Sequence, residues 1–163
     1  MKIFSKTKEK ITGKVMSIKD EVNKKVAEFV RPNWDEIWME TAHLLAKRSY
    51  DPRHQVGTII VTKDNTQVLA VGYNGNWSGG PNEVESVTPG ESGMIHAEVN
   101  ALLKCDYNNP KKKIAYVTLS PCRMCAKALV NAGISEVVYD KEYRNTSGLD
   151  ILRKAGLKVR QIF

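Results

Sequence analysis

The stretches Met94-Ile95-His96-Ala97-Glu98 and Ser120-Pro121-Cys122-Arg123-Met124-Cys125 carry the side chains around which this chain is organised. The first stretch supplies an imidazole and, two residues later, a carboxylate. The second supplies two thiols separated by two residues, directly after a proline. Histidine and cysteine are preferred zinc ligands. The spacing H-x-E followed by P-C-x-x-C therefore predicts a metal site in which two distant segments of the chain meet.

A catalytic zinc ion keeps three protein ligands and leaves its fourth position to water. We expect His96, Cys122 and Cys125 to be the three ligands of one zinc ion. Two thiolates and a neutral imidazole neutralise the charge of the ion, so the site can be buried. A hydrolysis at such a site also needs a proton shuttle beside the metal, and Glu98 is expected to be this general acid and base.

The Cys-x-x-Cys pair has two other interpretations, a redox-active pair or half of a structural zinc site. A structural site would need a fourth ligand, for which Cys105, His43 and His54 are the candidates. None of them shows the paired spacing that such sites prefer, and a structural site leaves Glu98 without a role. We therefore expect Cys105 to be a small buried residue, His43 a helix position and His54 a loop position without catalysis.

The positive charge of the chain is concentrated at its N-terminus. The 163 residues carry a net charge of +7, and residues 1–31 contribute +5 of it, from nine basic and four acidic side chains. The remainder is nearly neutral, so nucleic acid is not the expected partner of the main domain. There is no signal peptide, no apolar run near 18 residues and only three cysteines, which indicates a cytoplasmic protein with no membrane partner.

Residues 1–31 form a separate pattern. Apolar residues recur with helical spacing and predict a basic amphipathic helical extension, ending at Arg31-Pro32. The stripe consists of Ile11, Val15, Ile18, Val22, Val26 and Phe29. Packing on the main domain or on a neighbouring subunit is the expected role, and contact with a membrane surface or with nucleic acid is the alternative.

Residues 32–163 alternate between helical and extended patterns. Helices are expected at 34–48, from His96, from Cys122 and at 149–155, and strands at 56–61, 67–73, 114–119, 136–139 and 157–162. A hairpin followed by alternating helices and strands predicts an α/β fold, a three-layer α/β/α sandwich around one mixed five-stranded sheet. Residues 74–93 are rich in glycine and form a long loop, which in a compact domain is usually functional.

From Trp34 to its C-terminus the chain resembles the cytidine/deoxycytidylate deaminase superfamily and, within it, the deoxycytidylate (dCMP) deaminases. Besides the zinc pattern, the resemblance rests on Ala46-Lys47-Arg48-Ser49-x-Asp51-Pro52, Gln55-Val56-Gly57, Gly72-Tyr73-Asn74-Gly75, His96-Ala97-Glu98-x-Asn100-Ala101 and Tyr116-Val117-Thr118-Leu119-Ser120-Pro121-Cys122. It implies a cytidine deaminase-like fold and a zinc-dependent hydrolase that converts dCMP to dUMP and ammonia in pyrimidine deoxynucleotide metabolism.

The resemblance also implies roles for residues around the zinc site. Asn74 is expected to hydrogen-bond the deoxyribose, the Ala97 amide and the backbone of Leu119 and Ser120 to hold the cytosine edge, and Tyr143 to close over the base. The 5′-phosphate is expected to be read by one of the cations near matching segments, which are Arg48, Arg53, Lys47 and Arg144.

Regulation and assembly are further implications of the resemblance. Many members of the family are activated by dCTP and inhibited by dTTP, through a site that includes Gly72, Tyr73, Asn74 and Gly75 and takes Mg²⁺ with the triphosphate. This chain lacks the proline that the family usually has near Trp77. Some relatives hold a second, structural zinc with cysteines upstream of the active site. This chain has no cysteine before Cys105, so one zinc is expected, in a homo-oligomer.

Two other classes of function stay open at this point. One is a different deaminase of the superfamily, acting on a free nucleoside, a pterin-like base or adenosine in RNA. The other is a non-enzymatic nucleic-acid or membrane binder that uses residues 1–31 as an arm. Truncation of these residues separates the classes, because deamination persists without the arm whereas binding through it is lost.

Overall fold

The computed structural model describes residues 17–88 and 90–162. The chain divides into two units between Pro32 and Asn33. In the first unit, residues 17–28 are helical, and the apolar side chains Ile18, Val22, Val26 and Phe29 are each more than half exposed. The other two members of the predicted stripe, Ile11 and Val15, lie outside the described residues. The role of the extension stays a prediction.

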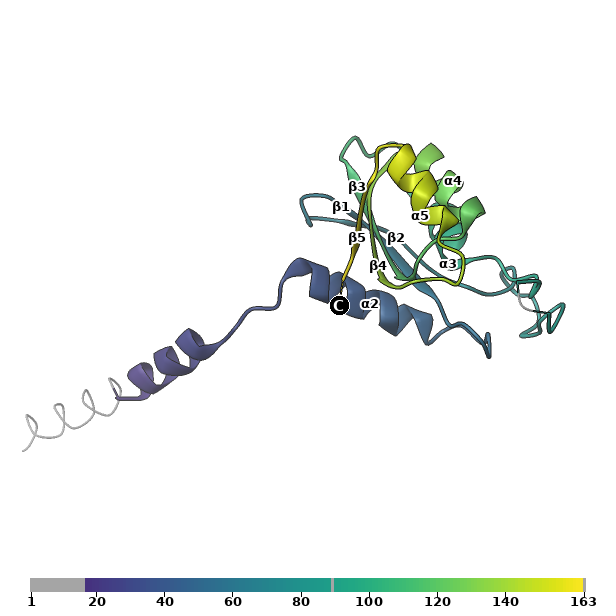
Figure 1. Cartoon of the computed structure of the whole chain (residues 1–163). Helices are drawn as coiled ribbons and strands as arrows, with labels where there is room; N and C mark the ends of the chain where they lie inside the picture. The colour runs from purple at the N-terminus through teal and green to yellow at the C-terminus, as the bar shows by residue number, and fades with distance from the viewer. Residues whose placement is uncertain (1–16, 89, 163) are drawn as a thin grey trace, which may run out of the picture. The chain divides into compact units, whose positions relative to one another are not determined.

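The second unit is built on one five-stranded sheet in the order β2-β1-β3-β4-β5. β1 runs antiparallel to β2 and β3, whereas β3, β4 and β5 are parallel. The elements are α2 (Trp34–Ala46), β1 (Gly57–Thr62), β2 (Val68–Tyr73), α3 (Ala97–Leu102), β3 (Lys113–Leu119), α4 (Arg123–Asn131), β4 (Ile134–Lys141), α5 (Ser147–Lys154) and β5 (Lys158–Gln161). Helix α2 covers one face of the sheet, and α3, α4 and α5 cover the other (Figure 1). The predicted three-layer sandwich with a mixed sheet is confirmed.

The interior strand β1 is buried on both of its faces, which explains its apolar run Ile59-Ile60-Val61. Ile60 belongs to the larger core, beneath α3, α4 and α5. Its neighbours Ile59 and Val61 point to the smaller core, which Met39 and Ala42 of α2 complete. Successive side chains of a strand point to opposite faces of the sheet. Because both faces are covered by helices, β1 contributes side chains to both cores.

Helix α2 is fixed at its start by a capping box and a buried polar network. Asn33 accepts a hydrogen bond from the Glu36 amide at 2.9 Å, and Glu36 accepts one from the Asn33 amide at 3.0 Å, as the capping pattern predicts. Asp35 then accepts hydrogen bonds from Tyr116 of β3 at 2.6 Å and from the Arg160 guanidinium of β5 at 2.7 and 3.0 Å. The Arg160 hydrogen bonds hold the pKa of Asp35 below its usual value.

Two glycines allow close packing against the backbone at the starts of α3 and α4, where the functional side chains lie. A Cβ atom on Gly72 of β2 would overlap the carbonyl oxygen of Ala97, at the start of α3. A Cβ atom on Gly148 of α5 would overlap the carbonyl oxygen of Pro121, just before α4. Larger residues at either position would push a helix start away from the sheet.

The helix starts differ in detail from the sequence expectation. α3 is only six residues long and begins at Ala97, with His96 as its N-cap residue. α4 begins at Arg123, with Cys122 as its N-cap. Pro121 therefore directly precedes the cap residue. No helix within residues 17–88 and 90–162 is long and apolar enough to cross a membrane.

Candidate active site

Three predicted metal ligands meet where the starts of α3 and α4 face each other. The His96 Nδ1 atom lies 3.3 Å from the Cys125 sulfur and 3.5 Å from the Cys122 sulfur. All candidate ligand atoms of the three residues lie within 4.8 Å of one another, and in the described part of the chain no fourth His, Cys, Asp or Glu joins them. Cys105, His43 and His54 are thus not members of this group.

The spacing of the three ligand atoms fits zinc. With Zn–S bonds of about 2.3 Å and Zn–N bonds of about 2.0 Å, tetrahedral angles separate the ligand atoms by roughly 3.5–3.8 Å. The observed separations of 3.3 and 3.5 Å need only small side-chain adjustments to reach this range. Two sulfurs and one nitrogen are also a donor set that zinc prefers.

Local electrostatics stabilise the thiolate form of Cys122, which is the form that binds a cation. Cys122 stands at the N-terminus of α4, and its sulfur accepts a hydrogen bond from the Cys125 amide at 3.5 Å. The hydrogen bond from the Cys125 thiol, more than any other contact, lowers the pKa of Cys122 to about 3. The same hydrogen bond raises the pKa of the Cys125 thiol, while the hydrogen bond with Cys122 raises the pKa of His96. The lowered pKa favours the thiolate form of Cys122, which is the form that binds a metal ion.

Glu98 lies beside the three ligands in the first turn of α3. Its side chain is 4% exposed, and this burial raises the pKa of its carboxyl group. With His96 and Cys122 it lines a single cavity. A buried carboxyl group with a raised pKa is suited to take up and release a proton near neutral pH.

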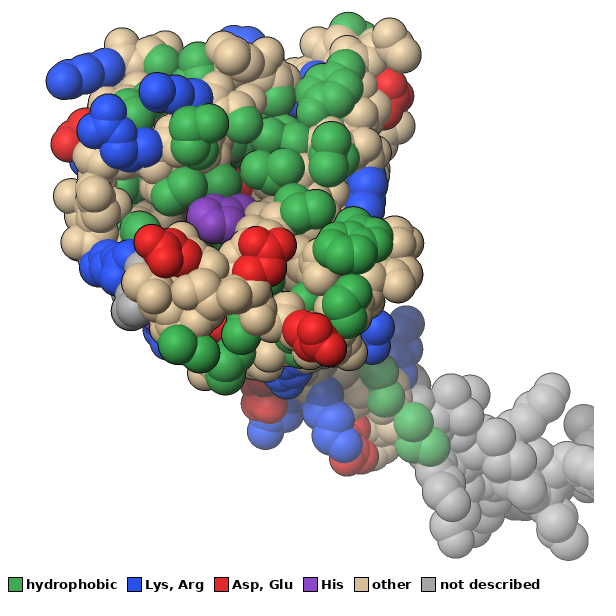
Figure 2. All heavy atoms as spheres, turned by 90° about the vertical axis from the view of Figure 1, so that its right-hand side faces the viewer, with side chains coloured by type: hydrophobic (Ala, Val, Ile, Leu, Met, Phe, Trp, Pro, Cys, Tyr) green, Lys and Arg blue, Asp and Glu red, His purple; other side chains and the backbone are tan. Residues whose placement is uncertain are grey.

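We distinguish two parts of this cavity. The metal end consists of His96, Ala97, Glu98 and Cys122, and the rim consists of Arg53, His54, Gly90, Tyr143 and Arg144. Figure 2 looks onto the side of the domain that carries the long loop 74–93. There a histidine lies in a hollow flanked by hydrophobic side chains, and acidic side chains stand on the surface beside it. The rim residues are exposed or half-buried.

Loop 74–93 is fastened to the rest of the domain at three points. At its base, Gly75 and Ile95 exchange backbone hydrogen bonds of 3.1 and 2.9 Å. The Tyr50 hydroxyl is 3.3 Å from the carbonyl oxygens of Pro81 and Glu83. The Arg53 guanidinium donates to the carbonyl oxygens of Val87, Thr88 and Ser86, at 2.9, 3.0 and 3.5 Å. Two side chains of the segment 50–53 therefore hold the loop in place.

The structure places most of the expected substrate residues around the cavity. Those that line it are Asn74, Ala97, Leu119, Ser120, Arg53, Tyr143 and Arg144. Tyr143 is held by its amide, which donates to the Ser120 hydroxyl at 2.8 Å. Arg48 is not among the described residues that line the cavity, and its guanidinium lies 6.0 Å from the centroid of the Tyr73 ring.

Asn74 is buried, and its side chain is largely occupied by the protein itself. Its Oδ1 atom accepts from the Val56 amide at 2.8 Å, and its Nδ2 atom donates to the His54 carbonyl at 2.9 Å. The same nitrogen lies 3.4 Å from Asp51 Oδ2. One lone pair on Oδ1 remains for a sugar hydroxyl, so Asn74 shapes the cavity wall in addition to any contact with substrate.

The four residues expected in an effector site are placed in the fold in a similar way. Gly72 belongs to β2 and lies against α3, and Gly75 pairs with Ile95. The carbonyl of Tyr73 accepts from Asn100 at 2.9 Å. These contacts give the four residues a structural role where β2 joins the loop 74–93. A regulatory role for them stays a prediction.

Several cavity residues were not assigned a role from the sequence. Asp51, Val56, Ser92 and Met94 line the cavity, and so does His54, which had been expected to occupy a loop without catalysis. These residues follow no periodic pattern. Asp51 and His54 meet because Asp51 caps the turn 51–54, its carboxylate accepting from the amides of Arg53 and His54 at 2.8 and 3.2 Å.

Comparison with known proteins agrees with this geometry. Residues 32–141 match the model of the cytidine and deoxycytidylate deaminase zinc-binding region. The chain is 35% identical over 158 residues to the deoxycytidylate deaminase of Saccharomyces cerevisiae, covering 90% of this chain and 50% of the relative. It is 37% identical over 127 residues to that of Mycobacterium phage D29, covering 69% and 98%. The chain thus spans about half the length of the yeast relative.

A solved structure gives the same answer. The crystal structure of the dCMP deaminase from cyanophage S-TIM5, in complex with dCMP and dUMP, superposes with a TM-score of 0.70 at 34% identity, covering 82% of this chain and 100% of that one. The resemblance predicted from the motifs is confirmed at the level of the family. The chain belongs to the cytidine and deoxycytidylate deaminase family, and the cluster of His96, Cys122 and Cys125 lies within the region that matches its zinc-binding model.

Proposed function

We propose that this protein is a zinc-dependent hydrolase that deaminates dCMP to dUMP and ammonia. The observation that carries the proposal is the convergence of His96, Cys122 and Cys125 next to the buried carboxyl group of Glu98, in one cavity. The relatives named above support the choice of dCMP, because they are deoxycytidylate deaminases and one was solved with dCMP and dUMP.

The residues at the metal end divide the chemistry between them. A zinc ion bound by the three ligands supplies a water whose pKa is lowered to about 7. Glu98 would take one proton from the attacking water and pass it to the ring nitrogen. It would then take the second proton from the same oxygen and pass it to the exocyclic amine, which leaves as ammonia. Burial of Glu98 favours its neutral form and so makes it a competent donor in the second half of the reaction.

The walls of the cavity orient the pyrimidine. The Ala97 amide and the backbone of Leu119 and Ser120 border the metal end, where they are placed to hold the polar edge of cytosine. Tyr143, which the Ser120 hydroxyl fixes through its amide, is placed to cover the base. Asn74 offers its remaining lone pair to the 3′-hydroxyl of the deoxyribose.

Among the cations considered from the sequence, Arg144 is our choice for the 5′-phosphate. Arg144 lines the cavity, and its guanidinium lies 5.6 Å from the centroid of the Tyr143 ring. Arg53 also lines the cavity, but its guanidinium donates hydrogen bonds to carbonyl oxygens of the loop. Arg48 lies against Tyr73 instead.

A substrate panel tests the proposal. Purified protein is incubated with dCMP, CMP, dCTP, deoxycytidine and an adenosine-containing RNA, and ammonia release is measured. We expect the highest kcat/KM for dCMP. If RNA or deoxycytidine is turned over in preference to dCMP, the protein belongs to another branch of the family. Enzymatic function is refuted if no substrate is deaminated and the protein instead binds nucleic acid in a way that truncation of residues 1–31 abolishes.

Assembly and regulation are proposed separately. We infer a homo-oligomer in the cytoplasm, supported by the strongly exposed side chains Leu103, Tyr107 and Met124 beside α3 and α4. Light scattering tests it, and a monomer of about 18 kDa would contradict it. For regulation, dCTP and dTTP are added with Mg²⁺ to a dCMP assay, where activation by the first and inhibition by the second are the expected effects.

A further inference from the structure

The rim of the cavity presents an imidazole that the proposed chemistry does not use. His54 lines the cavity, and its side chain is exposed toward solvent. No hydrogen bond reaches its ring nitrogens from the described residues, and its one ring contact is with Tyr143. An imidazole that is not used within the protein and faces a nucleotide site is available to a ligand.

The backbone of His54 is held much more firmly than a typical exposed loop residue. Its amide donates to Asp51 Oδ1 at 3.2 Å, and its carbonyl accepts from Asn74 Nδ2 at 2.9 Å. Both partners are buried, at 7% and 6% exposure. The position of the Cα atom is therefore fixed by two side chains from the interior, so that the ring is presented from a rigid support.

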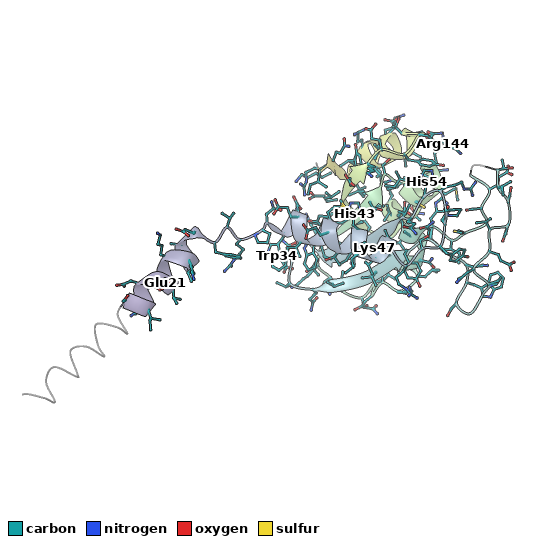
Figure 3. All side chains as sticks on the ribbon, turned by 90° about the horizontal axis from the view of Figure 1, so that it is seen from below. Glu21, Trp34, His43, Lys47, His54 and Arg144 are labelled. Carbon is teal, nitrogen blue, oxygen red and sulfur yellow. The ribbon has the colours of Figure 1, made fainter. Side chains whose placement is uncertain are left out.

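The ring of His54 and the guanidinium of Arg144 converge on the same aromatic side chain. The Arg144 guanidinium lies over the face of Tyr143, 5.6 Å from the ring centroid. The His54 ring meets Tyr143 edge-on, with centroids 6.4 Å apart and an interplanar angle of 79°. Both residues lie near the base of the long loop, whereas His43 lies on α2 (Figure 3).

The shape of the substrate determines which of its groups lies next to His54 and Arg144. In a nucleoside monophosphate, the amino-bearing carbon and the 5′-phosphate are at opposite ends of the molecule. The carbon must reach the metal end, so the phosphate is directed to the rim, where the cationic donors are. A phosphate carries about two negative charges and three acceptor oxygens, which is more than one guanidinium satisfies.

We infer that His54 is a specificity-determining residue that binds the 5′-phosphate of the substrate together with Arg144, which contacts the same Tyr143 ring. This inference rests on the proposed function. It goes beyond it by assigning the preference for a monophosphate over a nucleoside to a histidine on the turn 51–54, in addition to an arginine. Asp51 and Asn74 act as positioning residues, because they hold the backbone of His54.

Steady-state kinetics of His54→Gln with dCMP and with deoxycytidine test the inference. We expect kcat/KM for dCMP to fall roughly tenfold, mainly through KM, because one hydrogen bond to a charged group is lost. For deoxycytidine kcat/KM should not change, since no phosphate is present. Inorganic phosphate should also compete with dCMP less strongly in the variant than in the wild-type protein.

Two further variants separate recognition from structure. His54→Arg places a guanidinium donor at the same backbone position and should recover the preference for dCMP. His43→Gln is the matched control, because His43 is a half-buried histidine that pairs with Asp140 at 2.9 Å and is not among the residues lining the cavity. It should leave both substrates unaffected.

The outcomes distinguish this inference from the proposed function. If the wild-type protein deaminates dCMP but His54→Gln lowers kcat/KM equally for dCMP and deoxycytidine, His54 contacts the sugar or the base and the inference is wrong. An unchanged kcat/KM for dCMP in His54→Gln overturns it as well. If the wild-type protein does not act on dCMP at all, the proposed function fails first.

Discussion

The metal end and the rim of the cavity are built in different ways. At the metal end, functional side chains occupy the first residues of two helices, α3 and α4, and residues close in sequence act together. At the rim, the residues come from three loop segments, which are residues 53–54, Gly90 and residues 143–144. Hydrogen bonds join distant loops there, such as the bond from Arg53 to Val87, 34 residues apart. Under the proposed function, the chemistry at the metal end therefore depends on local spacing, whereas recognition of the substrate at the rim depends on contacts between distant segments.

The largest effect is expected at the metal end. Glu98→Gln keeps the shape of the side chain but removes the proton shuttle, so kcat should fall roughly 10²–10⁴-fold. Zinc content and thermal stability should be retained, because Glu98 is not among the predicted ligands. The exposed Glu40→Gln on α2 is the matched control. A Glu98→Gln enzyme within tenfold of the wild-type rate would show that the metal end works by another mechanism.

At the rim, the second prediction tests whether Arg53 anchors the loop 74–93 or binds the 5′-phosphate of the substrate. Arg53→Ala removes hydrogen bonds from a charged donor to the carbonyls of the loop, and should lower kcat/KM roughly ten- to thirtyfold. As a loop tether it should affect dCMP and deoxycytidine alike and speed proteolysis within residues 76–93. Arg153→Ala on α5 serves as control. A loss confined to dCMP would instead make Arg53 a phosphate ligand.

A third variant, away from both regions, separates stability of the fold from function of the site. Asp35→Asn disrupts the network with Arg160 and Tyr116 and should lower the free energy of unfolding by about 1.5–2 kcal/mol at neutral pH. Its carboxyl pKa is lowered in the folded protein by the hydrogen bonds from Arg160. The stabilisation is therefore fully present above the unfolded-state value of 3.8 and is lost as the pH falls through the folded-state pKa.

Urea unfolding of the wild-type protein and of Asp35→Asn between pH 7 and pH 3 measures this dependence. The difference between the two proteins should be constant down to about pH 4 and should shrink below it. Zinc content and kcat at neutral pH should be equal in the two folded proteins. A difference that grows toward acid pH would mean that the carboxylate of Asp35 is not what the network stabilises.

The smallest effect is expected in the sheet. Among the described side chains, the Thr58 hydroxyl of β1 is buried without a hydrogen-bond partner. Thr58→Val keeps the shape and removes the unsatisfied group, so the protein should become more stable by about 1 kcal/mol. The exposed Thr146→Val provides a comparison for the same substitution, because the Thr146 side chain makes no capping hydrogen bond. A destabilised Thr58→Val would indicate that the hydroxyl has a bonding partner, such as a water molecule.

The same contrast explains what the sequence was able to predict. The metal end was predicted because His96 with Glu98, and Cys122 with Cys125, have a fixed spacing along the chain, and the sheet because apolar runs such as 57–62 are buried on both faces. His54 was not predicted, because its place at the rim depends on Asp51 and Asn74, which come together only through the fold. The end of α3 at Leu102 was not predicted either, because no proline or glycine follows it before Pro110.

The choice among the arginines was open for a related reason. Arg48, Arg53 and Arg144 are equivalent by charge and by nearness to matching segments. Only their contacts distinguish them, since Arg48 lies near the Tyr73 ring, Arg53 holds the loop carbonyls, and Arg144 lies over Tyr143 in the cavity. A sequence pattern does not report which partner a long, flexible side chain selects.

The central claim is that His96, Cys122 and Cys125 together hold one catalytic zinc ion. Titration of the metal-free protein with zinc, with deamination of dCMP measured at each step, tests it most directly. We predict that activity rises in proportion to zinc and stops rising at about one equivalent per chain, as a single three-ligand site requires. Full activity of the metal-free protein, or a second equivalent needed for activity, would contradict the account.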